Sequence, residues 1–118
     1  MIKSLGHLFL SGIFISGGFG AFANPGGRVE KVGKAGIPEP KVATELNGAA
    51  MVVGGAMLGL NIAPKLGAAL LISTIIPTTV VGHAFWSEEG EAGRKAQQTQ
   101  FYKNLGLLGG LLLVLTEK

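Results

Sequence analysis

Residues 46–86 read LNGAAMVVGGAMLGLNIAPKLGAALLISTIIPTTVVGHAFW, and this stretch decides the fold. Its only charged side chain is Lys65, which separates an apolar run over 46–63 from a second one over 66–86. Each run has about the 20 residues that a helix needs to cross the hydrocarbon core of a bilayer. Because only Pro64 and Lys65 lie between the runs, they predict a transmembrane hairpin of antiparallel helices.

Two further apolar runs flank this hairpin. Residues 5–23 contain no charged side chain, and residues 101–116 contain only Lys103, near their start. A lysine there can reach the membrane surface on its apolar stem while the leucines after it stay in hydrocarbon. The sequence therefore predicts an all-α fold, a membrane four-helix antiparallel bundle. Residues 1–118 form this single domain, with spans at approximately 5–23, 46–63, 66–86 and 101–116.

The first run also resembles a secretory signal. Lys3 precedes the apolar stretch, and Ala21-Phe22-Ala23 has the small-residue pattern of a cleavage site. Cleavage and retention both fit this pattern, and we expect the segment to be retained as the first helix.

The composition agrees with a membrane protein. Hydrophobic residues make up 47% of the chain and charged residues 14%, whereas a soluble domain has about 25% charged residues. The 20 glycines suit membrane helices, where small residues allow close packing. The absence of cysteine excludes disulfides and iron–sulfur ligation by the chain's own residues. The net charge of +3 comes from bases beside apolar runs, so we expect lipid headgroups, not nucleic acid, as their partners.

The two longer connections, 24–45 and 87–100, are predicted on the side of the membrane opposite the termini. Residues 28–35 predict a short surface helix. Residues 87–100 fit either a solvated loop or a helix that begins near Glu88 and continues into the fourth span. In the third span, Pro77 predicts a bend, with Thr78 and Thr79 helping to satisfy the local backbone.

Basic residues near the spans predict the orientation. Those on the side of the termini are Lys3, Lys65 and Lys118. Those on the side of the long connections are Arg28, Lys31, Lys34, Lys41, Arg94, Lys95 and Lys103. This excess predicts long connections in the cytoplasm and both termini outside.

Pairs of glycines four residues apart predict close helix packing. They are Gly55 with Gly59 and Gly106 with Gly110. Packing inside the bundle and association with another copy or subunit both use such pairs, and we favour packing inside the bundle.

The two histidines do not predict a haem or metal site. Antiparallel spans place His7 and His83 near opposite membrane faces, roughly 20 Å or more apart in depth. That separation disfavours a haem held by both rings, and no residues have the spacing of metal ligands.

Polar side chains from every span gather instead at the face of the long connections. The candidate cluster comprises Asn24, Glu45, His83, Trp86, Lys103 and Asn104. Polar groups at membrane depth are costly and often functional, so the cluster predicts a site for a quinone headgroup, in which Glu45 and Lys103 form an ion pair. Ordinary interfacial anchoring by Trp86 and Lys103 explains the same residues equally well. No residue is predicted to be catalytic.

The order of several short motifs resembles the DoxX family over nearly the whole chain. The motifs are residues 8–14 (LFLSGIF), Asn24-Pro25, Gly36-Ile37-Pro38, Glu45 with Gly54-Gly55, residues 83–86 (HAFW), and residues 101–105 (FYKNL) with Gly109-Gly110. Many relatives have a basic residue near the end of the first helix, where this chain has Gly20-Ala21-Phe22. A site that needs this base is therefore not expected here.

The resemblance implies a bacterial plasma-membrane protein. Some members of the family are subunits of a thiosulfate:quinone oxidoreductase, and another assembles with superoxide dismutase and a sulfurtransferase. We therefore expect an accessory or anchoring subunit of a redox or respiratory assembly, without catalytic activity or a cofactor of its own. The alternatives are a quinone-interacting oxidoreductase subunit and a small solute carrier. Expected partners are the bilayer and either other membrane subunits or a second copy.

Overall fold

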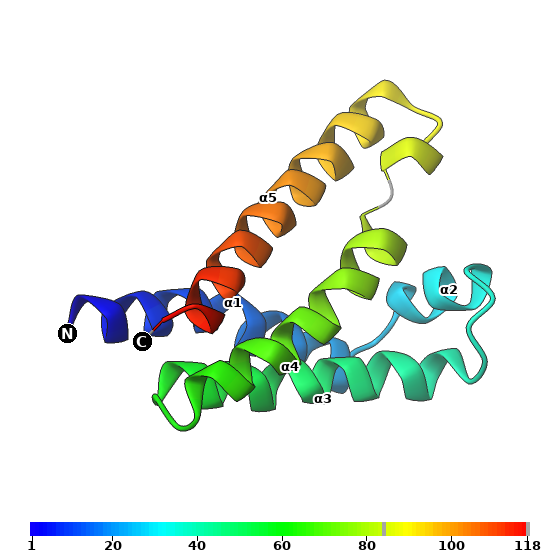
Figure 1. The fold of residues 1–118 in the computed structure, drawn as a ribbon. Helices are drawn as coiled ribbons and strands as arrows, with labels where there is room; N and C mark the ends of the chain where they lie inside the picture. Colours follow the sequence, from blue (N-terminus) through cyan, green and yellow to red (C-terminus); the bar gives the residue numbers. More distant parts are fainter. Residues whose placement is uncertain (84, 118) are drawn as a thin grey trace.

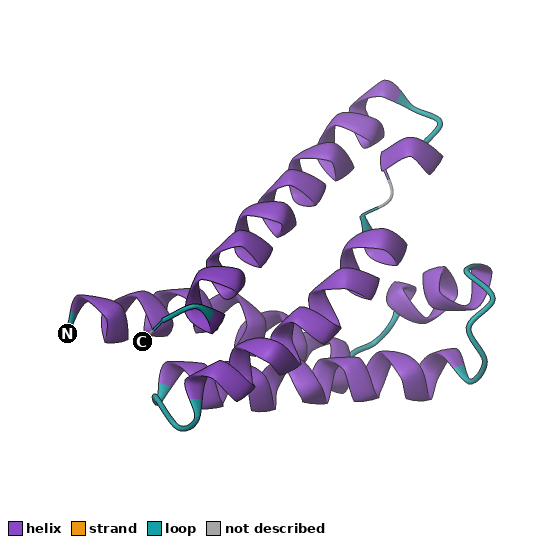
Figure 2. Cartoon of the chain, in the orientation of Figure 1, coloured by secondary structure: helices purple, strands orange, loops and turns teal. Residues whose placement is uncertain are grey.

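The computed structural model describes residues 1–83 and 85–117, which contain only helices, turns and loops (Figure 2). Lys118, counted above among the basic residues near the termini, lies outside this range. The α-helices are α1 (Ile2–Ala23), α2 (Gly27–Lys34), α3 (Pro40–Gly59), α4 (Pro64–Pro77) and α5 (Glu91–Leu115). A π-helical turn, η1 (Thr78–Gly82), and a 3-10 turn, η2 (Phe85–Ser87), lie between α4 and α5. The predicted all-α fold is confirmed.

The long helices form a chain of antiparallel neighbours. Helix α1 packs along α3, α3 packs on α4, and α4 packs on α5, with the two termini at the same end (Figure 1). The α4–α5 pair leans away from α1 and α3 toward the end of the long connections, where α2 lies beside α3 and η1. The short surface helix predicted over 28–35 is therefore present as α2.

Glycines allow α1 and α3 to touch through their backbones. A Cβ atom added at Gly18 would lie 2.6 Å from the carbonyl oxygen of Gly48, and one added at Gly48 would lie 2.6 Å from the carbonyl oxygen of Gly18. Both distances are shorter than real side-chain contacts, so only glycine fits at this crossing. Close backbone approach is the main way in which membrane helices gain packing energy.

The turn between α3 and α4 begins earlier than predicted. The apolar run continues to residue 63, but α3 ends at Gly59, and Asn61 and Ala63 have left-handed backbones with φ of 57° and 49°. The residue before a proline is disfavoured in the right-handed α region, and Ala63 is the N-cap of α4, outside both helices. Asparagine tolerates the left-handed region better than most residues. The predicted antiparallel hairpin is present, with a longer turn.

Pro77 changes the helix geometry as predicted. Helix α4 ends there and continues as the wider turn η1. The hydroxyl of Thr78 donates to the carbonyl oxygen of Thr74 at 2.7 Å, and that of Thr79 donates to the carbonyl oxygen of Ile75 at 2.6 Å. These bonds supply donors to the backbone next to the proline, which has no N–H.

Helix α5 decides between the two interpretations of residues 87–100. It begins at Glu91 and runs through the polar segment without a break, so most of the segment is helix rather than loop. Among the described residues, three helical segments are long and apolar enough to cross a membrane: Ile2–Ala23, Pro40–Gly59 and Pro64–Ser87. The first half of α5 carries Glu91, Arg94 and Lys95, and its apolar part is shorter. The fourth span stays a prediction.

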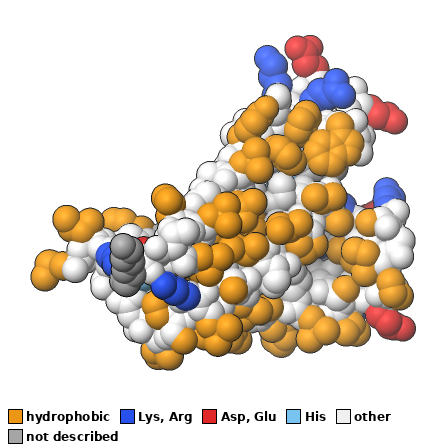
Figure 3. Space-filling view, in the orientation of Figure 1, with side chains coloured by type: hydrophobic (Ala, Val, Ile, Leu, Met, Phe, Trp, Pro, Cys, Tyr) orange, Lys and Arg blue, Asp and Glu red, His pale blue; other side chains and the backbone are white. Residues whose placement is uncertain are grey.

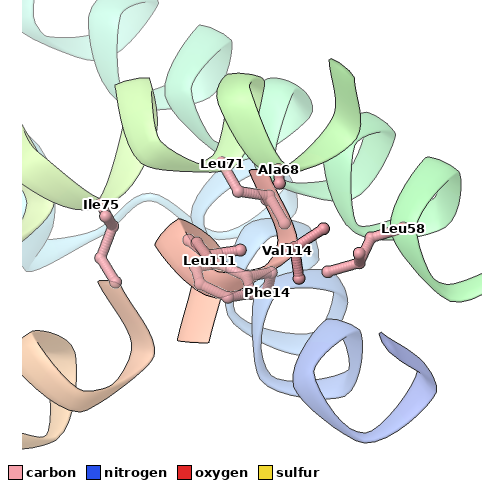
Figure 4. Packing of buried hydrophobic residues seen from close by; sticks show 7 residues of the cluster. All are labelled: Phe14, Leu58, Ala68, Leu71, Ile75, Leu111 and Val114. Atoms are coloured by element: carbon pink, nitrogen blue, oxygen red, sulfur yellow. The ribbon is translucent and has the colours of Figure 1, made fainter. Parts of the chain in front are cut away.

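The core of the bundle is small and lies where all four long helices meet. Phe14, Leu58, Leu71 and Leu111 are at most 2% exposed, and Ala68, Ile75 and Val114 complete the cluster (Figure 4). Large side chains such as Phe9 (72% exposed) and Leu113 (69% exposed) face outward instead. Hydrophobic side chains are spread over the whole visible face, and charged groups lie toward its ends (Figure 3). This distribution fits helices whose outer surface contacts lipid.

Candidate ligand-binding cavity

The lean of α4 and α5 leaves a cavity of about 780 Å³ at the end of the long connections. All five α-helices and η1 contribute to its lining, and α2 covers one side of it. Most of the wall is apolar and includes Ile13, Phe14, Val32, Met51 and Leu107. Volumes of about 300–1,000 Å³, with apolar walls and a few polar groups, are typical of small-molecule sites.

The inner wall carries two amide–hydroxyl pairs that connect helices. Nδ2 of Asn47 on α3 donates to Oγ1 of Thr78 at 2.9 Å. Nδ2 of Asn104 on α5 donates to Oγ1 of Thr79 at 2.9 Å. Both threonines lie just after Pro77, so the wide turn η1 brings their hydroxyls to the neighbouring helices. These pairs hold the amide groups of Asn47 and Asn104 in the cavity lining.

His83 lies at the cavity end of η1. Its Nδ1 is 2.8 Å from Oε1 of Gln97 on α5. A carbonyl oxygen only accepts hydrogen bonds, so Nδ1 is the donor in this contact, and in the neutral form of the ring Nε2 then carries a lone pair. Within residues 1–83 and 85–117, Nε2 has no partner. The ring therefore keeps one nitrogen available to a ligand.

Three basic side chains line the same cavity: Arg28 and Lys31 from α2, and Lys103 from α5. Lys31 connects α2 to η1, because its Nζ donates to the carbonyl oxygen of Gly82 at 3.1 Å. The Lys103 ammonium donates to Oε1 of Gln100 at 2.5 Å. No glutamate is among the described lining residues. The cavity is thus apolar over most of its wall and positively charged at one part of it.

The structure brings half of the predicted cluster together. His83, Lys103 and Asn104 line the cavity, whereas Asn24, Glu45 and Trp86 do not. Asn24 ends α1, and its carbonyl oxygen accepts a hydrogen bond from Arg28.

Glu45 and Trp86 lie outside the cavity for different reasons. Glu45 is half-buried on α3, and no ion pair joins it to Lys103 among the described residues, in contrast to our expectation. Trp86 packs edge-to-face against Phe85 and Phe101, in the aromatic contact between η2 and α5.

Several polar lining residues were absent from the predicted cluster, among them Arg28, Lys31, Thr78 and Gln97. The surface helix was predicted, but its position over the cavity depends on packing against α3 and η1, which no local pattern contains. Thr78 was identified only as a backbone partner. Gln97 precedes the predicted fourth span. Its contact with His83 depends on α5 beginning at Glu91, which the sequence did not decide.

A second polar group lies at the other end of the bundle, away from the cavity. His7 is 4% exposed; its Nδ1 is 2.6 Å from Oδ1 of Asn61 and its Nε2 is 2.8 Å from Oε1 of Glu117. Nδ2 of Asn61 also donates to Oγ of Ser4 at 2.7 Å. The two histidines therefore lie at opposite ends, as predicted. Each is held by side chains of other segments.

The predicted packing glycines take different positions. A Cβ at Gly55 would meet Cγ1 of Ile15 at 2.7 Å, and one at Gly59 would meet Oγ of Ser11 at 2.6 Å, so both lie against α1. A Cβ at Gly110 would lie 3.5 Å from Leu10. Gly106 has open space in the described structure. Three of the four thus lie inside the bundle.

Fold and cavity together define a small helical protein of the membrane type with a mostly apolar cavity among its helices. The family model named DoxX matches residues 3–84, and the chain belongs to the DoxX family. The match ends before α5, so the polar residues that α5 contributes to the cavity lie beyond it. No curated protein and no solved structure matches the chain.

Proposed function

We propose that this chain is an accessory subunit of a membrane redox or respiratory assembly and that its cavity holds the head of a quinone-type electron carrier. The cavity carries this proposal, because a subunit that only anchors others needs no internal space of about 780 Å³. We assign binding and positioning to this chain, and electron transfer to a partner subunit. We also propose a bacterial plasma membrane, with the long connections in the cytoplasm.

The lining fits a quinone head in both of its redox forms. Quinone carbonyls accept hydrogen bonds, and the ammonium of Lys103 is a donor in the wall. Quinol hydroxyls donate, and the available lone pair of Nε2 in His83 is an acceptor. The apolar residues around these groups suit the hydrocarbon tail of such a carrier.

Equilibrium binding of short-chain ubiquinone and menaquinone analogues to the chain in lipid nanodiscs tests the site. Replacing His83→Phe or Asn47→Leu is expected to weaken binding at least about tenfold, the effect of losing roughly 1.4 kcal/mol. Glu45→Gln is the matched control, because Glu45 lies two residues from Asn47 on α3 but outside the cavity. Equal affinity in all variants, with helicity retained, excludes the cavity as a quinone site.

Mass spectrometry of what copurifies with the tagged chain from native membranes in mild detergent tests the assembly. Stoichiometric recovery of a redox or respiratory complex is the expected result. Recovery of the chain alone contradicts the subunit role. In that case, solute flux into vesicles that contain only this chain distinguishes a carrier from a self-contained quinone-binding protein.

A further inference from the structure

The charge of the cavity lining is unbalanced in a way that a quinone does not explain. Arg28, Lys31 and Lys103 line it, and none of the described glutamates does. The ion pairs within residues 1–83 and 85–117 are His7–Glu117 and Lys34–Glu30, so the three cavity bases have no carboxylate partner there. A neutral headgroup leaves this positive charge uncompensated, whereas an anionic one neutralises it.

The basic side chains keep donors for a ligand. The Lys31 ammonium is bound to one carbonyl oxygen, that of Gly82 at 3.1 Å, and the Lys103 ammonium to one amide oxygen, that of Gln100. The Arg28 guanidinium donates through Nη1 to the carbonyl oxygen of Asn24 at 3.2 Å. An ammonium has three donors and a guanidinium five, so each group has donors left. Lys31 and Lys103 line the same cavity as His83.

The apolar part of the lining indicates which kind of molecule carries the anionic group. Apolar side chains from four helices and the α2–α3 loop also line the cavity: Ile13, Phe14, Val32, Ile37, Met51 and Leu107. A free oxyanion in contact with these groups loses hydration without compensation. A molecule with an anionic head and a hydrocarbon chain satisfies both parts of the wall.

We propose that Arg28, Lys31 and Lys103 bind the phosphate of an anionic phospholipid whose hydrocarbon chain enters the apolar part of the cavity. Helix α2 is the main element of this site, because it contributes two of the bases and is fastened across the cavity by Lys31. Clusters of basic residues on a helix at the membrane surface are typical of anionic-lipid recognition. The inference does not depend on the quinone proposal. Because both ligands use the same cavity, lipid and quinone compete for it, and the lipid test below is independent of the result of the quinone test.

Native mass spectrometry tests this site with the purified full chain and equal amounts of phosphatidylglycerol and phosphatidylcholine. We expect phosphatidylglycerol to be retained at least about tenfold better, a difference of roughly 1.4 kcal/mol. Lys31→Gln and Lys103→Gln are each expected to reduce this preference several-fold. Lys34→Gln is the matched control: it removes the same charge from the same helix, but Lys34 pairs with Glu30 outside the cavity.

Three results overturn the proposal. Equal retention of both lipids shows that the site does not select an anion. Equal effects of Lys31→Gln and Lys34→Gln show general attraction to the basic surface instead of a built site. Displacement of the lipid by millimolar inorganic phosphate shows that a free oxyanion is the ligand.

Circular dichroism and thermal unfolding of each variant ensure that the compared proteins have the same fold. Lys31→Arg keeps the charge and should therefore retain the lipid.

Discussion

Two buried polar side chains connect helices at opposite ends of the bundle. Asn104 is 5% exposed and joins α5 to the turn after α4, while His7 is 4% exposed and joins α1 to the α3–α4 turn and to the end of the chain. In a bilayer, a polar side chain that loses its partner has no water to replace it. Both residues therefore favour the helix packing in which their hydrogen-bond partners lie within reach.

Replacing Asn104→Ala should lower the free energy of unfolding by about 1 kcal/mol, the typical net contribution of one hydrogen bond. The loss arises because Thr79 loses the amide donor at 2.9 Å. Leu105→Ala is the control, since Leu105 is 44% exposed on the same helix and faces away from that bond. Equilibrium unfolding in mixed detergent micelles measures both. A larger loss for Leu105→Ala contradicts the importance of the buried bond.

The His7 group separates the contribution of charge from that of hydrogen bonding. His7→Ala removes two hydrogen bonds and leaves Asn61 and Glu117 without the ring, so we expect a loss of about 1–3 kcal/mol. Glu117→Gln keeps an acceptor oxygen beside Nε2 and removes only the charge, so its loss should be smaller. The same unfolding assay compares them. If Glu117→Gln is as destabilising as His7→Ala, the ion pair and not the hydrogen-bond network is the main contribution.

At the scale of elements, glycine sets how closely α1 and α3 approach. Gly18→Ala places a methyl group 2.6 Å from both the carbonyl oxygen of Gly48 and Cβ of Met51, so the helices must separate. Overpacking of this kind costs about 1–3 kcal/mol. Gly12→Ala on the same helix meets nothing within 4 Å and should not destabilise the protein. Thermal unfolding of the two variants checks the difference, and equal midpoints would show that the crossing is not tightly packed.

The positions of the helices along the chain could be predicted from the sequence, but the angles at which they pack against one another could not. Uninterrupted apolar runs predicted the hairpins, and Pro77 predicted the change of helix geometry, because both are local effects of composition. The end of α3 at Gly59 was missed, since the apolar run continues through Leu60 and Ile62 into the turn. The cavity was not predictable, because it depends on the lean of α4 and α5 away from α1. Glu45 is an example: it lies at the end of α3 where the cluster was predicted, but it is not on the side of the helix that lines the cavity.

At the scale of the whole molecule, the crossing of α5 remains the main prediction about topology. Its end meets the α1 core through Leu111 and Val114, and its first half is polar. Because the chain has no cysteine, single cysteines report the side of the membrane without background. Lys34, Lys65 and Thr116 are exposed, and they lie near the long connections, at the start of α4 and after α5, respectively.

Labelling of Lys34→Cys, Lys65→Cys and Thr116→Cys in intact spheroplasts with a membrane-impermeant thiol reagent distinguishes the possible topologies. If α5 crosses and the excess of basic residues sets the orientation, Lys65→Cys and Thr116→Cys react from outside. Lys34→Cys then reacts only after permeabilisation, which also controls for the reactivity of each site. The reverse pattern for all three variants means that the orientation is inverted while the four spans are kept. Reaction of Thr116→Cys on the side of Lys34→Cys means that α5 does not cross, and that the bundle spans the membrane with three segments.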